Sequence, residues 1–207
     1  LLANTTGIQN TAVGTFAGDA MTTAGGNTAL GYNAMSACTT GGGNTAVGNV
    51  AMANGVVTGL YNTALGGGSL LVLTSGANNT GLGKDALAAN TTANNNTAVG
   101  YQSLLANTTG AFNTALGRNA GTANTTASRN AIGDNALLAN TTASNNTAVG
   151  KDALISNTTG AGNVGLGFEA MDANTTGAAN TALGNNALGS NTTAANNTAV
   201  GHDALKA

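Results

Sequence analysis

The chain has 207 residues, of which 42% are hydrophobic, 3% aromatic and 6% charged. A conventional globular core needs large aliphatic and aromatic side chains, so this composition argues against one. The formal net charge of -2 provides neither the basic surface that nucleic acid binding requires nor attraction to an acidic membrane surface. No apolar run approaches the roughly 18 to 20 residues that span a bilayer, so neither a nucleic acid partner nor membrane insertion is expected.

A 17-residue unit recurs along the whole chain and is clearest from Asn96 to Phe112. Units begin 17 residues apart, with single exceptions of 18 and 16, and we number the positions of a unit from 1 to 17. Position 3 is always Ala or Gly, position 4 is always aliphatic, and position 5 is always Gly. Such uniform columns require a fold in which like positions stack on one another. Eleven units open at Asn10, Asn27, Asn44, Asn62, Asn79, Asn96, Asn113, Asn146, Asn163, Asn180 and Asn197. A degenerate unit opens near Arg129, between those of Asn113 and Asn146.

The predicted elements are short strands joined by turns, one set in each unit. A unit of 17 residues is too short for a pair of helices, and a fixed Gly beside Thr, Val and Asn would weaken a helix interior. We therefore predict an all-β fold, a β-solenoid of the parallel β-roll type, with one coil per repeat and about twelve coils about 4.8 Å apart. Residues 1–207 are predicted to form a single repeat array, which consists of a partial unit at the N-terminus followed by twelve full units. Both ends fall inside a repeat, which predicts a fragment of a longer fibre.

In chain order, the first three full units differ most at position 12, where Met21, Cys38 and Gly55 occur. A lone cysteine at such a position is expected to be a buried, inert thiol. The fourth unit contains a run of glycines and aliphatic residues from Gly66 to Leu73, which predicts a local bulge or a contact patch. The units from Asn79 onward are nearly uniform apart from a one-residue deletion near Arg129, and no linker or domain boundary is visible.

Two columns are predicted to fill the coil interior. The aliphatic column at position 4 is expected to be the structural core: Val13, Leu30, Val47, Leu65, Leu82, Val99, Leu116, Ile132, Val149, Leu166, Leu183 and Val200. Position 12 is expected to form a buried Asn ladder, because stacked amides can hydrogen-bond from coil to coil. Its members are Asn90, Asn107, Asn124, Asn140, Asn157, Asn174 and Asn191.

The small residues at position 3 are predicted to face outward, because adjacent strand residues point to opposite faces. An exposed strip of Ala, on the order of 500 Å², would favour a partner, and a second copy of the chain is the simplest partner. We therefore predict a parallel homo-oligomer that associates through Ala12, Ala29, Ala46, Ala64, Ala98, Ala115, Ala131, Ala148, Ala182 and Ala199. Eight of the twelve charged residues occupy positions 6 and 7, which predicts a solvated corner after the Gly bend.

The recurring N-T-A-V-G and N-T-A-L-G motifs resemble the head repeats of trimeric autotransporter adhesins. They are also similar to 17-residue repeats of bacterial and phage tail-fibre-like proteins, whereas the adhesin heads have a shorter repeat. The resemblance covers essentially the whole chain. It implies a left-handed β-roll, a trimer or filament of copies, and a location outside the cell, on the cell surface or on a virion. It also implies a possible cell-surface receptor, and it carries over no catalytic residue.

Motifs that could carry chemistry are weak. Gly160 to Gly165 matches G-x-G-x-x-G but straddles a repeat junction, where the strand and helix of a dinucleotide site are not expected. One hexapeptide in each unit matches left-handed β-helix acyltransferases, for which His202 is the sole candidate base. Acidic residues are too scattered for a calcium array. Asn-Thr-Thr triplets such as Asn107 to Thr109 are formal glycosylation sequons, which matter in a eukaryotic source. We expect no enzyme, cofactor or metal.

Two functions remain open. The sequence favours a structural or adhesive extracellular fibre segment, which could be a filament, a tail fibre or an adhesin head. In such a segment the variable corners and the stretch from Gly67 to Leu73 would contact receptors or neighbours. The alternative is an ice-binding β-solenoid, because the chain is rich in Thr and poor in charge. Position 2 is expected to share a face with the buried position 4. Its Thr would then be half buried, which leaves too few outward Thr columns for an ice plane.

Overall fold

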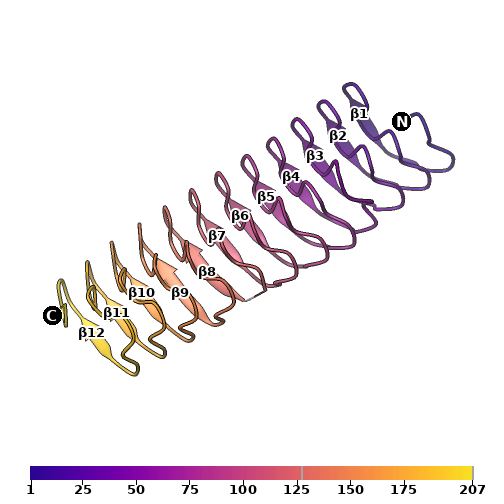
Figure 1. The fold of residues 1–207 in the computed structure, drawn as a ribbon. Helices are drawn as coiled ribbons and strands as arrows, with labels where there is room; N and C mark the ends of the chain where they lie inside the picture. The colour runs from indigo at the N-terminus through magenta and orange to yellow at the C-terminus, as the bar shows by residue number, and fades with distance from the viewer. Residues whose placement is uncertain (127, 207) are drawn as a thin grey trace.

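The computed structural model describes residues 1–126 and 128–206 and is a β-solenoid, as predicted. Twelve short parallel strands stack in chain order into one sheet, and no helix occurs among the described residues (Figure 1). The strands are β1 (Thr11–Val13), β2 (Thr28–Leu30), β3 (Thr45–Val47), β4 (Thr63–Leu65), β5 (Thr80–Leu82), β6 (Thr97–Val99), β7 (Thr114–Leu116), β8 (Arg129–Ile132), β9 (Asn146–Val149), β10 (Val164–Leu166), β11 (Thr181–Leu183) and β12 (Thr198–Val200).

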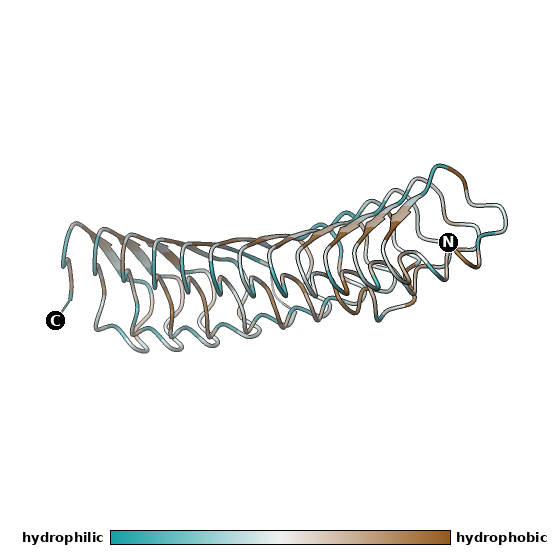
Figure 2. Cartoon of the chain, turned by 90° about the horizontal axis from the view of Figure 1, so that it is seen from above, coloured by the Kyte–Doolittle hydropathy of each residue, from teal (hydrophilic) through white to brown (hydrophobic). Residues whose placement is uncertain are grey.

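Each strand pairs in register with the same positions of the next unit. Thr97, Ala98 and Val99 of β6 lie opposite Thr114, Ala115 and Leu116 of β7. Register is kept across the longer unit that follows β3 and the shorter unit that follows β7. Hydropathy therefore repeats along the length of the array, coil after coil (Figure 2).

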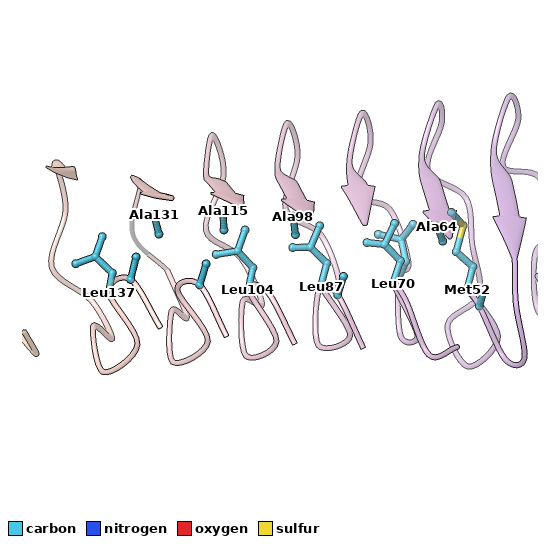
Figure 3. Packing of buried hydrophobic residues seen from close by; sticks show 14 of the residues in the cluster. Met52, Ala64, Leu70, Leu87, Ala98, Leu104, Ala115, Ala131 and Leu137 are labelled. Atoms are coloured by element: carbon cyan, nitrogen blue, oxygen red, sulfur yellow. The ribbon is translucent and has the colours of Figure 1, made fainter. Parts of the chain in front are cut away.

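The small residues at position 3 line the interior, which corrects the predicted orientation of the strands. Ala98, Ala115 and Ala131 are fully buried and point from their strands toward Leu87, Leu104 and Leu137 (Figure 3). Self-association through this column is therefore wrong. The residues predicted to face outward that are instead fully buried are Ala29, Ala46, Ala64, Ala98, Ala115, Ala131, Ala148 and Ala182. Ala199 is also buried, and Ala12 is partly buried at the end of the array.

Packing explains why only Ala or Gly occupies position 3. A Cβ atom built on Gly165 would lie 3.4 Å from Leu154, and one built on Gly81 would lie 3.5 Å from Leu70 and would collide with Ser69 Oγ at 2.5 Å. Both leucines occupy position 9 of the preceding coil and are fully buried. Because the Leu and Met side chains of position 9 already fill the coil, the facing strand has room for a methyl group and little more. The restriction reflects packing inside the coil rather than contact with a partner.

The aliphatic residues at position 4 consequently face outward, so their assignment to the core is wrong. Eight of them are exposed by 36% to 69%: Val13, Leu30, Leu65, Leu82, Leu116, Ile132, Leu166 and Val200. The other four, Val47, Val99, Val149 and Leu183, are partly buried. The alternation of strand faces was correct, but both columns are apolar and uniform, so periodicity alone could not decide which one is inside.

Asn side chains occupy the interior at two positions. The position 12 residues Asn90, Asn107, Asn124, Asn140, Asn157 and Asn174 are fully buried, and Asn191 is partly buried. Asn107 Nδ2 donates to Gly110 O at 2.9 Å, and Asn174 Nδ2 donates to Asn157 Oδ1 at 2.9 Å. These bonds close the turn and connect neighbouring coils, which satisfies Nδ2 donors that would otherwise be costly to bury, whereas Asn90 Oδ1 and Asn140 Oδ1 are buried without a hydrogen-bond partner in the described part of the chain.

The opening Asn of the unit forms a second ladder, which the sequence reasoning missed. The backbone N–H and Nδ2 of Asn113 both donate to Asn96 Oδ1 at 2.9 Å, and Asn96 Nδ2 donates to Gly110 O at 2.9 Å. Both Asn side chains are buried, and the pattern recurs along most of the array. The near-invariance of Asn at position 1 was the available signal for this ladder.

The Gly at position 5 makes the bend that ends each strand. Gly100 has a φ of +130°, and a Cβ atom there would collide with the carbonyl of Gly117 in the next coil. Both the conformation and the close approach exclude larger residues.

Candidate functional site

The candidate site is the outward face of the sheet, which we call the strand face. It consists of position 2 and position 4 of the twelve described strands, and neither position carries a charged residue in any of them. Position 2 is Thr in ten strands, with Asn130 and Val164 as exceptions. Because these residues share a face with position 4, a Thr column runs beside the aliphatic column. The column points outward rather than into the coil, which corrects the expected orientation: six of its ten Thr residues, including Thr28 and Thr97, are exposed, and the other four are partly buried.

The corner at positions 6 and 7 borders the strand face on one side. Lys84 pairs with Asp85 at 3.3 Å, Lys151 pairs with Asp152 at 3.3 Å, and Arg118 Nε pairs with Asp134 Oδ1 at 2.9 Å. The Asp134 carboxylate raises the pKa of the Arg118 guanidinium, which is fully exposed. The corner is solvated as predicted, and its charges are matched locally. Exposed pairs of this kind contribute little stability.

Aromatic side chains lie at the same corner. Lys84 Nζ lies 5.6 Å from the ring centre of Tyr101, and Lys151 Nζ lies 5.4 Å from that of Phe168. Near the N-terminus, the rings of Phe16 and Tyr32 meet edge to face at 6.2 Å. All six aromatic residues of the chain are exposed, because the coil interior is filled by Ala, Leu, Met and Asn.

The fourth coil does not form the predicted bulge, and within the apolar run Leu71 and Val72 are partly exposed. Leu70 and Leu73 are fully buried and fill the interior, and Ser69 Oγ donates to Gly81 O at 2.9 Å. Strand β4 keeps its register with β5. The apolar run therefore replaces interior residues of other coils, and Leu73 takes the place of the position 12 Asn.

Cys38 and His202 have ordinary environments. Burial raises the pKa of the Cys38 thiol to about 11, and its Sγ lies 3.6 Å from Gly41 O, so the protonated thiol is part of the core. His202 is exposed at the corner of the last described coil, with Nδ1 3.1 Å from Asp203 Oδ2. Asp203 also pairs with Lys206 at 3.1 Å, and hydrogen bonding to Lys206 lowers the pKa of this carboxyl.

Other sequence motifs are structural in the coil. The segment from Gly160 to Gly165 runs through a turn into β10, and no helix follows it among residues 166–206. Gly165 faces the interior, where Leu154 packs against it. The Asn107 amide of the Asn107 to Thr109 sequon is fully buried, so it is inaccessible to a glycosylating enzyme in the folded coil.

Arg129 is the one position where the opening Asn is replaced, and its importance was not foreseen. It is 3% exposed, and its guanidinium donates to Asn140 O at 2.6 Å, to Thr141 O at 3.1 Å and to Asn124 Oδ1. Burial lowers the pKa of Arg129 to about 9, because the cation is removed from water without a carboxylate beside it.

Neither a metal-binding cluster nor a membrane-spanning helix is present among the described residues. No cluster of three or more His, Cys, Asp or Glu side chains that could hold a metal ion occurs among the described residues. Within the same residues, no helix has the length and apolar character needed to cross a membrane. Comparison with protein-family models, with curated proteins and with solved structures found no match for this chain.

Proposed function

We propose that the protein is a non-catalytic structural or adhesive segment of an extracellular fibre, on a cell surface or a virion, that assembles with copies of itself. The observation that carries the proposal is that each coil offers its successor the same binding surface. Strand β6 pairs with β7 as β5 pairs with β6, and the Asn ladder repeats these contacts in the interior. Such a fold adds length with each unit, by about 4.8 Å per coil.

The adhesive part of the proposal concerns the corner at positions 6 and 7. The framework positions hardly vary, whereas this exposed corner carries residues as different as Lys84, Tyr101, Arg118 and Phe168. Exposed residues on a rigid scaffold can change without affecting the fold, which makes them suited to contact a receptor.

Removing a complete coil tests the length-generating role. Deletion of residues 96–112 removes one unit and lets β5 pair with β7, so the rod should shorten by about 4.8 Å and still unfold cooperatively. Deletion of residues 96–103 is the control, because it brings unlike positions into register and should abolish the fold. Small-angle X-ray scattering and electron microscopy would measure the length. A compact particle, or equal damage from the two deletions, would contradict the proposal.

Ice binding is the second candidate, and it is favoured by the outward Thr column. The Thr and aliphatic columns repeat about every 4.8 Å along the rod and lie about 6.6 Å apart across it, which makes a regular, uncharged plane. An ice-binding protein should inhibit ice recrystallisation, and replacement of Thr97 and Thr114 by Lys should abolish that activity while Thr109→Lys preserves it. An inactive wild-type protein would remove this candidate.

A further inference from the structure

We infer that the strand face is the surface through which the chain associates with a second copy of itself. This inference rests on the proposed fibre function and specifies the surface and the partner. Its starting point is the outward aliphatic column at position 4, which runs from Val13 to Val200, with eight residues exposed and four partly buried. Soluble monomers rarely leave a continuous apolar strip of this length uncovered.

The area of the strand face fits a specific protein interface. Most strands are three residues long, so twelve strands about 4.8 Å apart, with a width of three residues at about 3.3 Å each, give a face on the order of 570 Å². A standard interface buries about 800 Å² on each partner. The strand face therefore supplies about two thirds of the area that a standard interface buries on each partner, and side chains of the adjoining corner would supply the rest.

The regular spacing indicates that the partner is another copy. Successive outward side chains such as Leu82, Val99 and Leu116 lie in register and repeat at the spacing of the strands. A second strand face has the same spacing along its whole length, so its aliphatic column can pack alongside this column coil after coil. A partner without this repeat could match the face over only a few coils.

Electrostatics do not oppose this contact. The strand face carries no charge in the described strands, and the bordering cations Lys84, Arg118 and Lys151 each have an aspartate within 3.3 Å. Two identical faces can therefore approach without like charges meeting across the interface. The aromatic rings of Tyr101 and Phe168 at the corner would extend the apolar contact at its edge.

Charged substitutions on the strand face provide the test. The variant with Val99→Glu and Val149→Glu should sediment with the mass of one chain at micromolar concentration, whereas the wild type sediments as a multiple. The matched control carries Thr109→Glu and Thr159→Glu, which change the exposed turns of the same two coils, and it should remain associated. Circular dichroism should show β structure in all three proteins, because none of these side chains fills the coil interior.

Two milder changes keep the test decisive if glutamate disturbs folding. Replacement of Val99 and Val149 by Thr preserves the β-branched shape and should weaken association about tenfold. Val99→Cys should form an interchain disulfide under mild oxidation, whereas Thr109→Cys should not, and buried Cys38 should not react in either protein. A monomeric wild type, or an association that survives both Val99 and Val149 substitutions, would overturn the inference. If the wild type is a monomer and still a rod of full length, the proposed interface is wrong but the length-generating role of the coils stands. The same holds if this monomer binds ice.

Discussion

The regular coil of β6 and the junction between β7 and β8 solve the same packing problem with different residues. In the regular coil, Asn96 accepts two hydrogen bonds from Asn113 and donates one to Gly110 O. At the junction the unit is one residue shorter, and Arg129 takes the place of the Asn opposite Asn146. The backbone register continues on both sides. Strand pairing therefore sets the register, and the interior side chains adapt to it.

The junction has an energetic cost that the regular coil avoids. Asn96 is neutral, and its amide groups find partners on both neighbouring coils, Asn79 and Asn113. Arg129 instead buries a cation, and its Nε has no hydrogen-bond partner among the described atoms. Burial of a cation without a counter-ion is destabilising even when its other donors are satisfied. We expect the stack to be weakest at this junction.

The largest effect is expected from changing the bend of a regular coil. Gly100→Val introduces a β-branched side chain at a φ of +130° and against the carbonyl of Gly117. The combined strain and collision should lower the free energy of unfolding by about 3 kcal/mol or more. Thermal or denaturant unfolding followed by circular dichroism would measure the loss. Equal stability of Gly100→Val and the wild type would refute the assigned bend.

Removing one ladder residue should have the next largest effect. Asn96→Ala leaves the buried N–H of Asn113 without its acceptor and removes one of the two donors to Gly110 O, the other being Asn107, which should cost about 2 to 3 kcal/mol. Thr109→Ala is the control, because Thr109 is exposed, does not have a positive φ, and takes no part in the ladder. Chemical denaturation of both variants checks the difference. Similar losses from the two changes would show that the interior ladder contributes little.

Restoring the regular residue at the junction should have a smaller effect of opposite sign. Arg129→Asn removes the buried cation and offers Asn146 the acceptor that an Asn at this position offers its neighbour elsewhere. The free energy of unfolding of Arg129→Asn should therefore be about 1 kcal/mol higher than that of the wild type. Denaturant unfolding would show a higher midpoint. A lower midpoint would mean that the bonds from Arg129 to Asn140 O and Thr141 O outweigh the cost of burying its charge.

The smallest effect is expected at the solvated corner. Gln102→Lys changes a partly exposed residue at position 7, beside the ring of Tyr101, and should alter stability by less than about 0.5 kcal/mol. The same melting experiments provide the comparison with Gly100→Val. A loss as large as that of Gly100→Val would contradict the assignment of position 7 to the surface.

The repeat predicted the solenoid, the strand positions and the bend, because each depends on features that recur in every unit. Gly100 shows this, since its column is invariant and only one backbone role explains it. The orientation of Ala98 and Val99 could not be predicted in the same way. It depends on how much space Leu87 and Leu104 leave inside the coil, which is a property of packing between coils.

The candidate site depends on which face of each strand points outward. The sequence reasoning assigned the outward face to the Ala column of position 3, whereas positions 2 and 4 occupy it. The Asn residues of position 12 were placed inside because they exchange with Met21, Cys38 and Leu73. No such exchange marks the Asn of position 1, where the sole replacement is Arg129, a residue that would ordinarily indicate a surface position. Its burial follows from the strand register rather than from its chemistry.

The orientation of the strand face is the central claim, and thiol labelling tests it most directly. Ala98→Cys and Val99→Cys place a thiol on the inner and outer faces of one strand, with Cys38 as a buried reference. In dilute native protein, the thiol at position 99 should react rapidly with a small reagent, whereas those at positions 98 and 38 should react only on unfolding. Rapid labelling at position 98 together with protection at position 99 would contradict the account.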